Sequence, residues 1–280
     1  MRESSVQRWN LWSGLITAVT IICAVIWAFP LYWAVVSSIK PEDEVVRPYI
    51  ELWPETLTFQ HYIHALTATQ IGTWYLNSIV VAVGVTVVCV FTSMLCGYAL
   101  SQLRFPGRTT LWWIILASFM VPTQALIINH FELIANLGLV NTWIGTMLPQ
   151  FIHPVIIIVY KQFFDQVPRD FREAALMDNA SEFAILFKVY LPMNWGVTTA
   201  LSIVCFIWTW NAFLWPFLSV TRTEMMTVTV GITQVNDAFG VYYARELAAA
   251  VLAGLPVALA YLLFQRRVTE AITLSAGIKG

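Results

Sequence analysis

Charged residues are absent from six long stretches of the chain, and apolar side chains dominate each of them. A membrane-spanning helix needs roughly 20 consecutive, mostly apolar residues, so each stretch is long enough to supply one. The stretches are Trp9 to Ile39, Ala65 to Leu103, Thr109 to Asn129, Leu133 to Tyr160, Val189 to Thr221 and Leu247 to Gln265. We therefore predict six spanning helices near residues 12–36, 75–101, 109–129, 141–162, 196–219 and 247–265.

Prolines interrupt the fourth predicted span. Pro149 and the pair His153–Pro154 fall inside it, and a proline inside a helix removes one backbone hydrogen bond and bends the chain. At membrane depth the freed carbonyl groups must be satisfied by neighbouring helices. We therefore expect a kink in this span. The stretch that begins at Ala65 is longer than one span needs, so its first residues are expected to lie outside the membrane.

The composition supports an integral membrane protein. Only 15 basic and 16 acidic residues occur among 280, and 59% of the residues are hydrophobic. This chain has too few polar residues to cover the surface of a soluble fold of its length. A disordered chain would be far less hydrophobic. A net charge of −1 suggests no nucleic-acid partner. We expect an all-α, six-helix membrane fold that forms one domain over residues 1–280.

Basic residues gather in the connections that share one side of a six-span topology. Eleven of the 15 Lys and Arg residues lie in the N-terminal tail, the 102–108 connection, the 163–195 loop with its flanks, and the C-terminal tail. Cytoplasmic connections carry the excess of basic residues in membrane proteins. We therefore expect both termini and the 163–195 loop to be cytoplasmic, with the chain in a bacterial or archaeal cytoplasmic membrane.

The loop 163–195 is charged yet keeps helical apolar spacing. Pro168 suits a helix start, and Asn179 suits a left-handed stop because asparagine tolerates a positive φ angle. Ser181 is placed to cap a second helix over Glu182–Leu191, which we expect to end before Pro192. The pattern favours a helix–turn–helix below the membrane. A plain amphipathic linker held by local salt bridges is the alternative.

This loop resembles the EAA motif of binding-protein-dependent ABC transporter permeases. The residues that carry the resemblance are Glu173-Ala174-Ala175, Asn179 and Val189-Tyr190-Leu191-Pro192. The family pattern has glycine at the position of Asn179 and isoleucine at that of Val189. Other landmarks match along the chain, and they include Asn77-Ser78, Arg104–Arg108, Trp210-Asn211-x-Phe213 and the tail Ala276–Gly280. The last two resemble the carbohydrate-import branch, in particular the maltose-type second permease subunit.

The resemblance implies a type I importer permease whose loop couples transport to a separate ATPase. The implied coupling residues are Phe171, Arg172, Glu173, Ala174, Ala175, Leu176, Asp178, Asn179, Ala180 and Phe183. It also implies a second permease subunit in a heterodimer, two ATPase subunits, and an extracytoplasmic binding protein that faces the stretch from Arg222 to Glu246. ATP and Mg²⁺ would be bound by the ATPase, since this sequence has no GxxxxGK[ST] phosphate loop. We expect no catalytic residues, no metal site and no cofactor on this chain.

Polar and aromatic residues inside the spans are candidates for a solute pathway. They are Asn77, Gln124, Asn129, Trp208, Trp210, Asn211 and Trp215, with Gln150 and His153 as weaker candidates. Amide groups between aromatic faces suit sugars, and no Lys or Arg lies in a span core. A neutral sugar is therefore favoured over a glycerol-phosphate-type solute. A channel or secondary transporter is the alternative function, and a membrane enzyme would need a reactive cluster that the sequence does not show.

Overall fold

The structure, a computed structural model, describes residues 11–236 and 240–275, with side chains over 12–236 and 240–263. Helices make up its secondary structure throughout these ranges. The described chain forms two compact units. Unit 1 contains residues up to Thr69 and residues 234–252, and unit 2 contains residues 70–233 and those from Ala253 onward. The tail landmark Ala276–Gly280 lies outside the described residues.

Unit 1 joins a long apolar helix to a polar cap. Its elements are α1 (Leu11–Ser38), α2 (Glu42–Val45), α3 (Gln60–Ala68) and the first turns of α15 (Tyr243–Ser275). The Ser38 hydroxyl lies 2.6 Å from the Tyr62 hydroxyl, so the end of α1 is fixed to α3. The Glu42 carboxylate accepts hydrogen bonds from the backbone N–H groups of Tyr243 and Ala244, at 2.7 and 2.9 Å. An acidic side chain thus caps α15, where the helix dipole favours negative charge.

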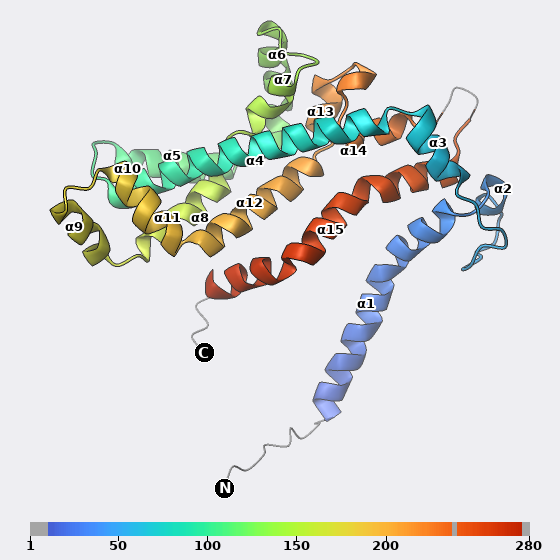
Figure 1. Cartoon of the computed structure of the whole chain (residues 1–280), viewed down its shortest axis with the longest axis horizontal. Coiled ribbons are helices and arrows are strands. Elements are labelled where there is room, and N and C mark those ends of the chain that lie inside the picture. The colour runs from blue at the N-terminus through green and yellow to red at the C-terminus, as the bar shows by residue number, and fades with distance from the viewer. Residues whose placement is uncertain (1–10, 237–239, 276–280) are drawn as a thin grey trace. The chain divides into compact units, whose positions relative to one another are not determined.

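Unit 2 is organised around one long helix, α4 (Ile71–Gln102). The helices α8 (Pro154–Asp165) and α12 (Trp195–Trp210) pack along it (Figure 1). Buried residues of α4 and α8 meet those of the 182–193 segment in a core that includes Tyr98, Tyr160, Phe164 and Tyr190. The remaining elements are α5 (Arg108–Phe119), η1 (Thr123–Leu126), α6 (Ile127–Asn136), α7 (Trp143–Met147), η2 (Leu148–Gln150), α9 (Arg169–Met177), α10 (Glu182–Ile185), η3 (Leu186–Tyr190), α11 (Leu191–Met193), α13 (Leu214–Ser219), η4 (Thr223–Met225), α14 (Val228–Gly231) and η5 (Ile232–Gln234).

Three of the predicted spans are long helices, and three are bent. The helices α1, α4 and α15 match the predictions near 12–36, 75–101 and 247–265. The kink predicted for the fourth span is confirmed, because α7–η2 and α8 meet at 50°. The prediction of one helix over 109–129 is corrected: α5 ends at Phe119, and the chain resumes at Thr123 with a bend of 94°. Pro122 explains the break, since it lacks an N–H group and disfavours helical geometry at Val121.

The fifth predicted span is also divided. The helix α12 ends at Trp210, and α13 begins at Leu214, so residues 196–219 do not form one helix as predicted. Before α12 the chain bends by 84° as it leaves the 182–193 segment. The length of the charge-free stretch therefore predicted the position of this apolar segment but not where its helices break. By length and composition, the structure has between three and six spans among its described residues.

Candidate coupling segment and translocation cavity

The segment 168–193 forms the predicted helix–turn–helix. The first helix, α9, begins after Pro168 and ends at Met177. Asn179 has a φ angle of 56°, which confirms the predicted left-handed turn. The Ala180 N–H donates to the Ala175 carbonyl and the Asn179 N–H to the Leu176 carbonyl, both at 3.0 Å. These two bonds form a Schellman motif, which satisfies carbonyl groups at the end of the helix and fixes the direction of the chain.

Substitution of Asn179 tests this turn. We expect Asn179→Ala to lower the stability of the segment by about 1 kcal/mol, because alanine pays the cost of a positive φ angle that asparagine largely avoids. Asn179→Gly should be neutral or slightly stabilising, since glycine adopts this conformation without a steric penalty. Limited proteolysis across 168–193 measures the effect. Equal cleavage rates for the two variants would contradict the assigned conformation.

The second helix of the segment differs from its prediction at its far end. The Ser181 side chain accepts a hydrogen bond from the Ala184 N–H at 3.3 Å, which confirms the predicted cap. The helix then widens into a π-helical stretch, η3, and continues past Pro192 to Met193. The expected end before Pro192 is therefore wrong. A π-helical stretch shifts the hydrogen-bond register, so a residue without an N–H group is accommodated within the helix.

An ion pair fixes α9 to the rest of unit 2. Arg172 on α9 donates to the Glu182 carboxylate, and the Tyr98 hydroxyl of α4 donates to the same carboxylate at 2.6 Å. Partial burial disfavours the charged guanidinium, but its hydrogen bonds to Glu182 and Tyr98 outweigh this and raise the pKa of Arg172. Charge-assisted hydrogen bonds of this kind are stronger than neutral ones. The three residues, here called the Arg172 clamp, therefore determine where α9 lies.

The predicted coupling residues divide between the two sides of this segment. Ala175 and Ala180 pack against the core of unit 2, and Arg172 belongs to the clamp. The outer side carries unpaired apolar surface: Phe171 is 50% exposed, Phe183 66% and Met177 83%. The other predicted residues on exposed positions are Glu173, Ala174, Leu176, Asp178 and Asn179. Met177 was not predicted, although its place on the apolar stripe of α9 could have indicated it.

A cavity of about 260 Å³ lies at three breaks between helices: after α5, before α8 and before α13. Its walls come from η1 and α6, from the break before α8, and from the break before α13. The polar and aromatic lining residues include Gln124, His130, Gln150, His153 and Trp215. Irregular backbone at membrane depth is tolerated where it lines a cavity, and discontinuous helices of this kind build the solute sites of many transporters. The cavity is therefore a candidate solute site.

Hydrogen bonds and ring contacts hold the cavity walls in place. The Trp215 indole N–H and the Gln150 amide both donate to the Thr146 carbonyl, at 3.0 and 2.9 Å. The His130 ring meets the Trp215 ring edge to face, with centroids 6.0 Å apart. His153 makes a similar contact with Trp208 at 5.9 Å. The aromatic faces are thus oriented by neighbours in unit 2.

Other predicted pathway residues lie away from the cavity lining. The Asn77 amide is buried, donates to the Glu224 and Met226 carbonyls at 2.8 and 2.9 Å, and accepts from the Trp143 indole at 2.9 Å. Trp210 is buried and donates to the Ala253 carbonyl at 3.2 Å. Both side chains therefore stabilise unit 2. Asn129 and Asn211 are exposed. His130 was missed because the third span was expected to end before it.

The comparisons with known proteins identify the family. Residues 89–270 match the family described as "Binding-protein-dependent transport system inner membrane component". The chain belongs to this family. It is thus a permease, a membrane component of a binding-protein-dependent transport system. The EAA-like residues 173–192 lie within the matched region.

Curated relatives of the permease match over most of its length. The arabinooligosaccharides transport system permease protein AraQ of Halalkalibacterium halodurans is 30% identical, over 96% of this chain and 97% of that protein. The diacetylchitobiose uptake system permease protein NgcG of Streptomyces coelicolor is 32% identical, over 91% and 86%. The sn-glycerol-3-phosphate transport system permease protein UgpE of Rhizobium meliloti is 30% identical, over 78% and 79%.

A solved structure supports the fold of the permease. A chain of a bacterial ABC transporter involved in the import of the acidic polysaccharide alginate matches with a TM-score of 0.83. The match covers 94% of this chain and 99% of that chain, at 24% identity. The likeness confirms the predicted all-α importer permease architecture.

Proposed function

We propose that the permease is one of two permease subunits of an ATP-driven sugar importer. The observation that carries the proposal is the pairing of an amphipathic helix, α9, which exposes apolar side chains, with a cavity at three helix breaks that is lined by apolar, aromatic and amide side chains. The first feature suits docking of a soluble ATPase, and the second suits passage of a polar solute. In this proposal the partners are a second permease, two ATPase subunits and an extracytoplasmic binding protein. ATP and Mg²⁺ are bound by the ATPase subunits.

The exposed side of the coupling segment, from α9 to Phe183 on α10, is the proposed ATPase contact. Phe171, Met177 and Phe183 leave apolar surface outside the core, while Glu173 and Asp178 add charges that fix orientation. Apolar anchors surrounded by polar groups are typical of protein interfaces. Ala175, Ala180 and the Arg172 clamp act behind this face, because they hold α9 against unit 2. The ATPase is a cytoplasmic partner in this proposal, so the coupling segment lies in the cytoplasm. With six spans both chain termini lie on the same side, in agreement with the distribution of basic residues.

A sugar is the proposed solute. Two of the relatives are named for arabinooligosaccharide and diacetylchitobiose transport. The cavity offers amide groups beside an indole ring, and no Lys or Arg is among its lining residues. Glycerol phosphate is the second candidate, because UgpE proteins are also among the relatives. Stimulation of ATP hydrolysis by loaded binding protein separates the two: a neutral oligosaccharide should stimulate, and sn-glycerol-3-phosphate should not.

Trp215→Ala tests the cavity. We expect uptake to fall by about tenfold, because an oriented aromatic face worth roughly 1.5 kcal/mol is lost from the proposed solute site. The matched control is Trp113→Ala, which removes an indole that is 65% exposed on α5, outside the cavity. Uptake into proteoliposomes measures both. A control that loses as much uptake as Trp215→Ala would contradict the assignment of the cavity.

A further inference from the structure

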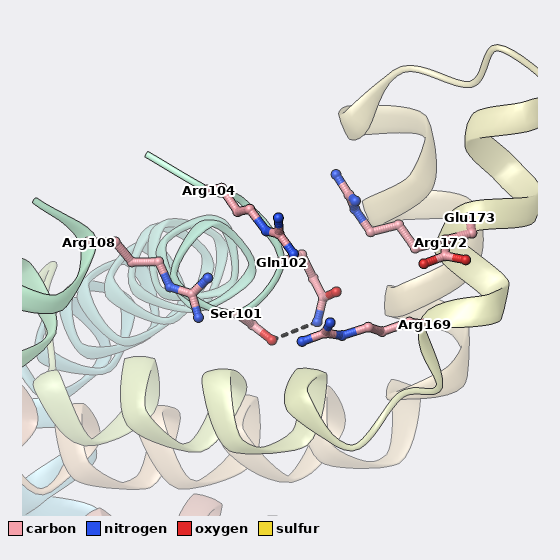
Figure 2. Close-up of a pocket in the computed structure, with 7 residues that line it drawn as sticks. All are labelled: Ser101, Gln102, Arg104, Arg108, Arg169, Arg172 and Glu173. Carbon is pink, nitrogen blue, oxygen red and sulfur yellow. Dashed lines mark hydrogen bonds between the residues drawn. The ribbon is translucent and has the colours of Figure 1, made fainter. Parts of the chain in front are cut away.

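A second cavity, of about 350 Å³, lies beside the coupling segment and is lined mainly by arginines. Arg104 and Arg108 come from the connection between α4 and α5, and Arg169 and Arg172 come from α9. Ser101, Gln102 and Glu173 complete its lining. Figure 2 shows Arg108 and Arg169 extending from opposite sides toward Ser101 and Gln102. We call this the arginine cavity.

The positive charge of the arginine cavity is poorly neutralised. Only Arg172, among these four, forms an ion pair within the described residues, and its partner is Glu182. Arg108 donates to the Leu103 carbonyl at 3.0 Å, which leaves its charge uncompensated. The buried Nε of Arg172 has no hydrogen-bond partner among the described side chains and backbone. One carboxylate, that of Glu173, lines the cavity against four guanidinium groups. Such a site attracts an anion with several acceptor oxygens.

The surroundings favour an anion that belongs to the membrane. Arg108 is the first residue of α5, and the helix continues into the exposed apolar side chains of Leu111, Trp113 and Ile114. Arginines one turn below exposed tryptophan and aliphatic side chains are typical of a membrane interface. A phosphate in the cavity would thus lie at the level of lipid headgroups, with acyl chains free to follow the apolar surface of α5. Basic pockets at the cytoplasmic side bind anionic headgroups in this way.

We infer that the arginine cavity binds the phosphate of an anionic phospholipid of the cytoplasmic leaflet. This inference rests on the cytoplasmic orientation of the coupling segment in the proposed function. A bound lipid would contact α9 and the 102–108 connection at once, because the cavity is lined by both. Lipid charge would therefore stabilise the position of the coupling helix.

Lipid selectivity of the full chain in phosphatidylcholine vesicles tests the inference. Electron paramagnetic resonance of spin-labelled phosphatidylglycerol, compared with spin-labelled phosphatidylcholine, gives the preference for the anionic lipid. We expect wild type to prefer phosphatidylglycerol, and Arg104→Gln with Arg108→Gln to weaken its binding about 30-fold, since each basic residue near an anionic surface contributes roughly a fivefold effect. Arg104→Gln alone, which leaves the Arg108 bond to Leu103 intact, should weaken it about fivefold.

One control variant and the outcomes that would overturn the inference complete the test. Lys188→Gln with Arg222→Gln removes two charges from exposed positions outside the cavity and should keep the preference. An unchanged preference in both arginine variants would overturn the inference. So would binding of inorganic phosphate to the lipid-depleted protein with no preference of wild type for phosphatidylglycerol, or loss of the ATPase subunits from the arginine variants with lipid preference intact. Lipid binding is measured without ATP, so its failure leaves the proposed transport function standing.

Discussion

Glu173→Lys is expected to reduce binding-protein-stimulated ATP hydrolysis by at least tenfold. Glu173 is exposed on α9, but its carboxylate also lines the arginine cavity. Glu173→Gln, which removes the charge without adding a cation beside the arginines, is therefore measured alongside and should leave the fold unchanged. In the docked complex the lysine would face ATPase groups that pair with a carboxylate. Placing like charges opposite one another at an interface costs several kcal/mol. Hydrolysis by the reconstituted transporter measures the effect.

The matched control for Glu173→Lys is Asp43→Lys. Asp43 is also exposed but lies in α2, outside the coupling segment and outside the stretch from Arg222 to Glu246 that is expected to face the binding protein. We expect the control to keep stimulated hydrolysis within about twofold of wild type, because an isolated surface substitution has little effect. Normal co-purification and stimulation of the ATPase with Glu173→Lys would show that this residue is not at the docking face.

Gly97→Ala is expected to destabilise unit 2. A Cβ atom at Gly97 would lie 2.7 Å from the Tyr160 Cβ and 3.1 Å from the Lys161 backbone nitrogen on α8. Neither neighbour moves without shifting the helix, and small residues at such interfaces let membrane helices approach closely. Overpacking of this kind costs about 1–3 kcal/mol. The melting temperature of the purified protein should fall by several degrees.

Gly84→Ala on the same helix is the matched control. Its Cβ would lie 2.8 Å from the Met147 sulfur, at the end of a flexible side chain that moves aside easily. We expect this variant to melt at or slightly above the wild-type temperature, since alanine stabilises a helix by roughly 0.5–1 kcal/mol relative to glycine. Equal melting temperatures for the two variants would contradict the close α4–α8 contact at Gly97.

The sequence predicted those features that depend on local chemistry. Charge-free runs located the apolar segments because charged side chains are costly in lipid. The conformation of Asn179 and the cap at Ser181 followed from side chains that bond to nearby backbone. The break at Pro122 was missed, although the rule that predicted the kink at Pro149 and Pro154 applies to it equally.

Features that depend on packing were beyond the reach of the sequence. Tyr98 and Glu182 are 84 residues apart, so their hydrogen bond in the Arg172 clamp has no local signal. The inward direction of Ala175 and Ala180 depends on how α9 and the turn after it pack against the core. The candidate solute cavity is formed by three separate breaks, and residue type alone could not separate its lining from structural residues such as Asn77 and Trp210.

ATP-coupled uptake tests the central claim most directly. Proteoliposomes containing the permease, a second permease subunit and the ATPase would be given a labelled neutral oligosaccharide with its binding protein outside and ATP inside. We predict uptake that requires both ATP and the binding protein and that Glu173→Lys abolishes. Uptake that persists without the ATPase, driven by an ion gradient or by the solute gradient alone, would contradict the account.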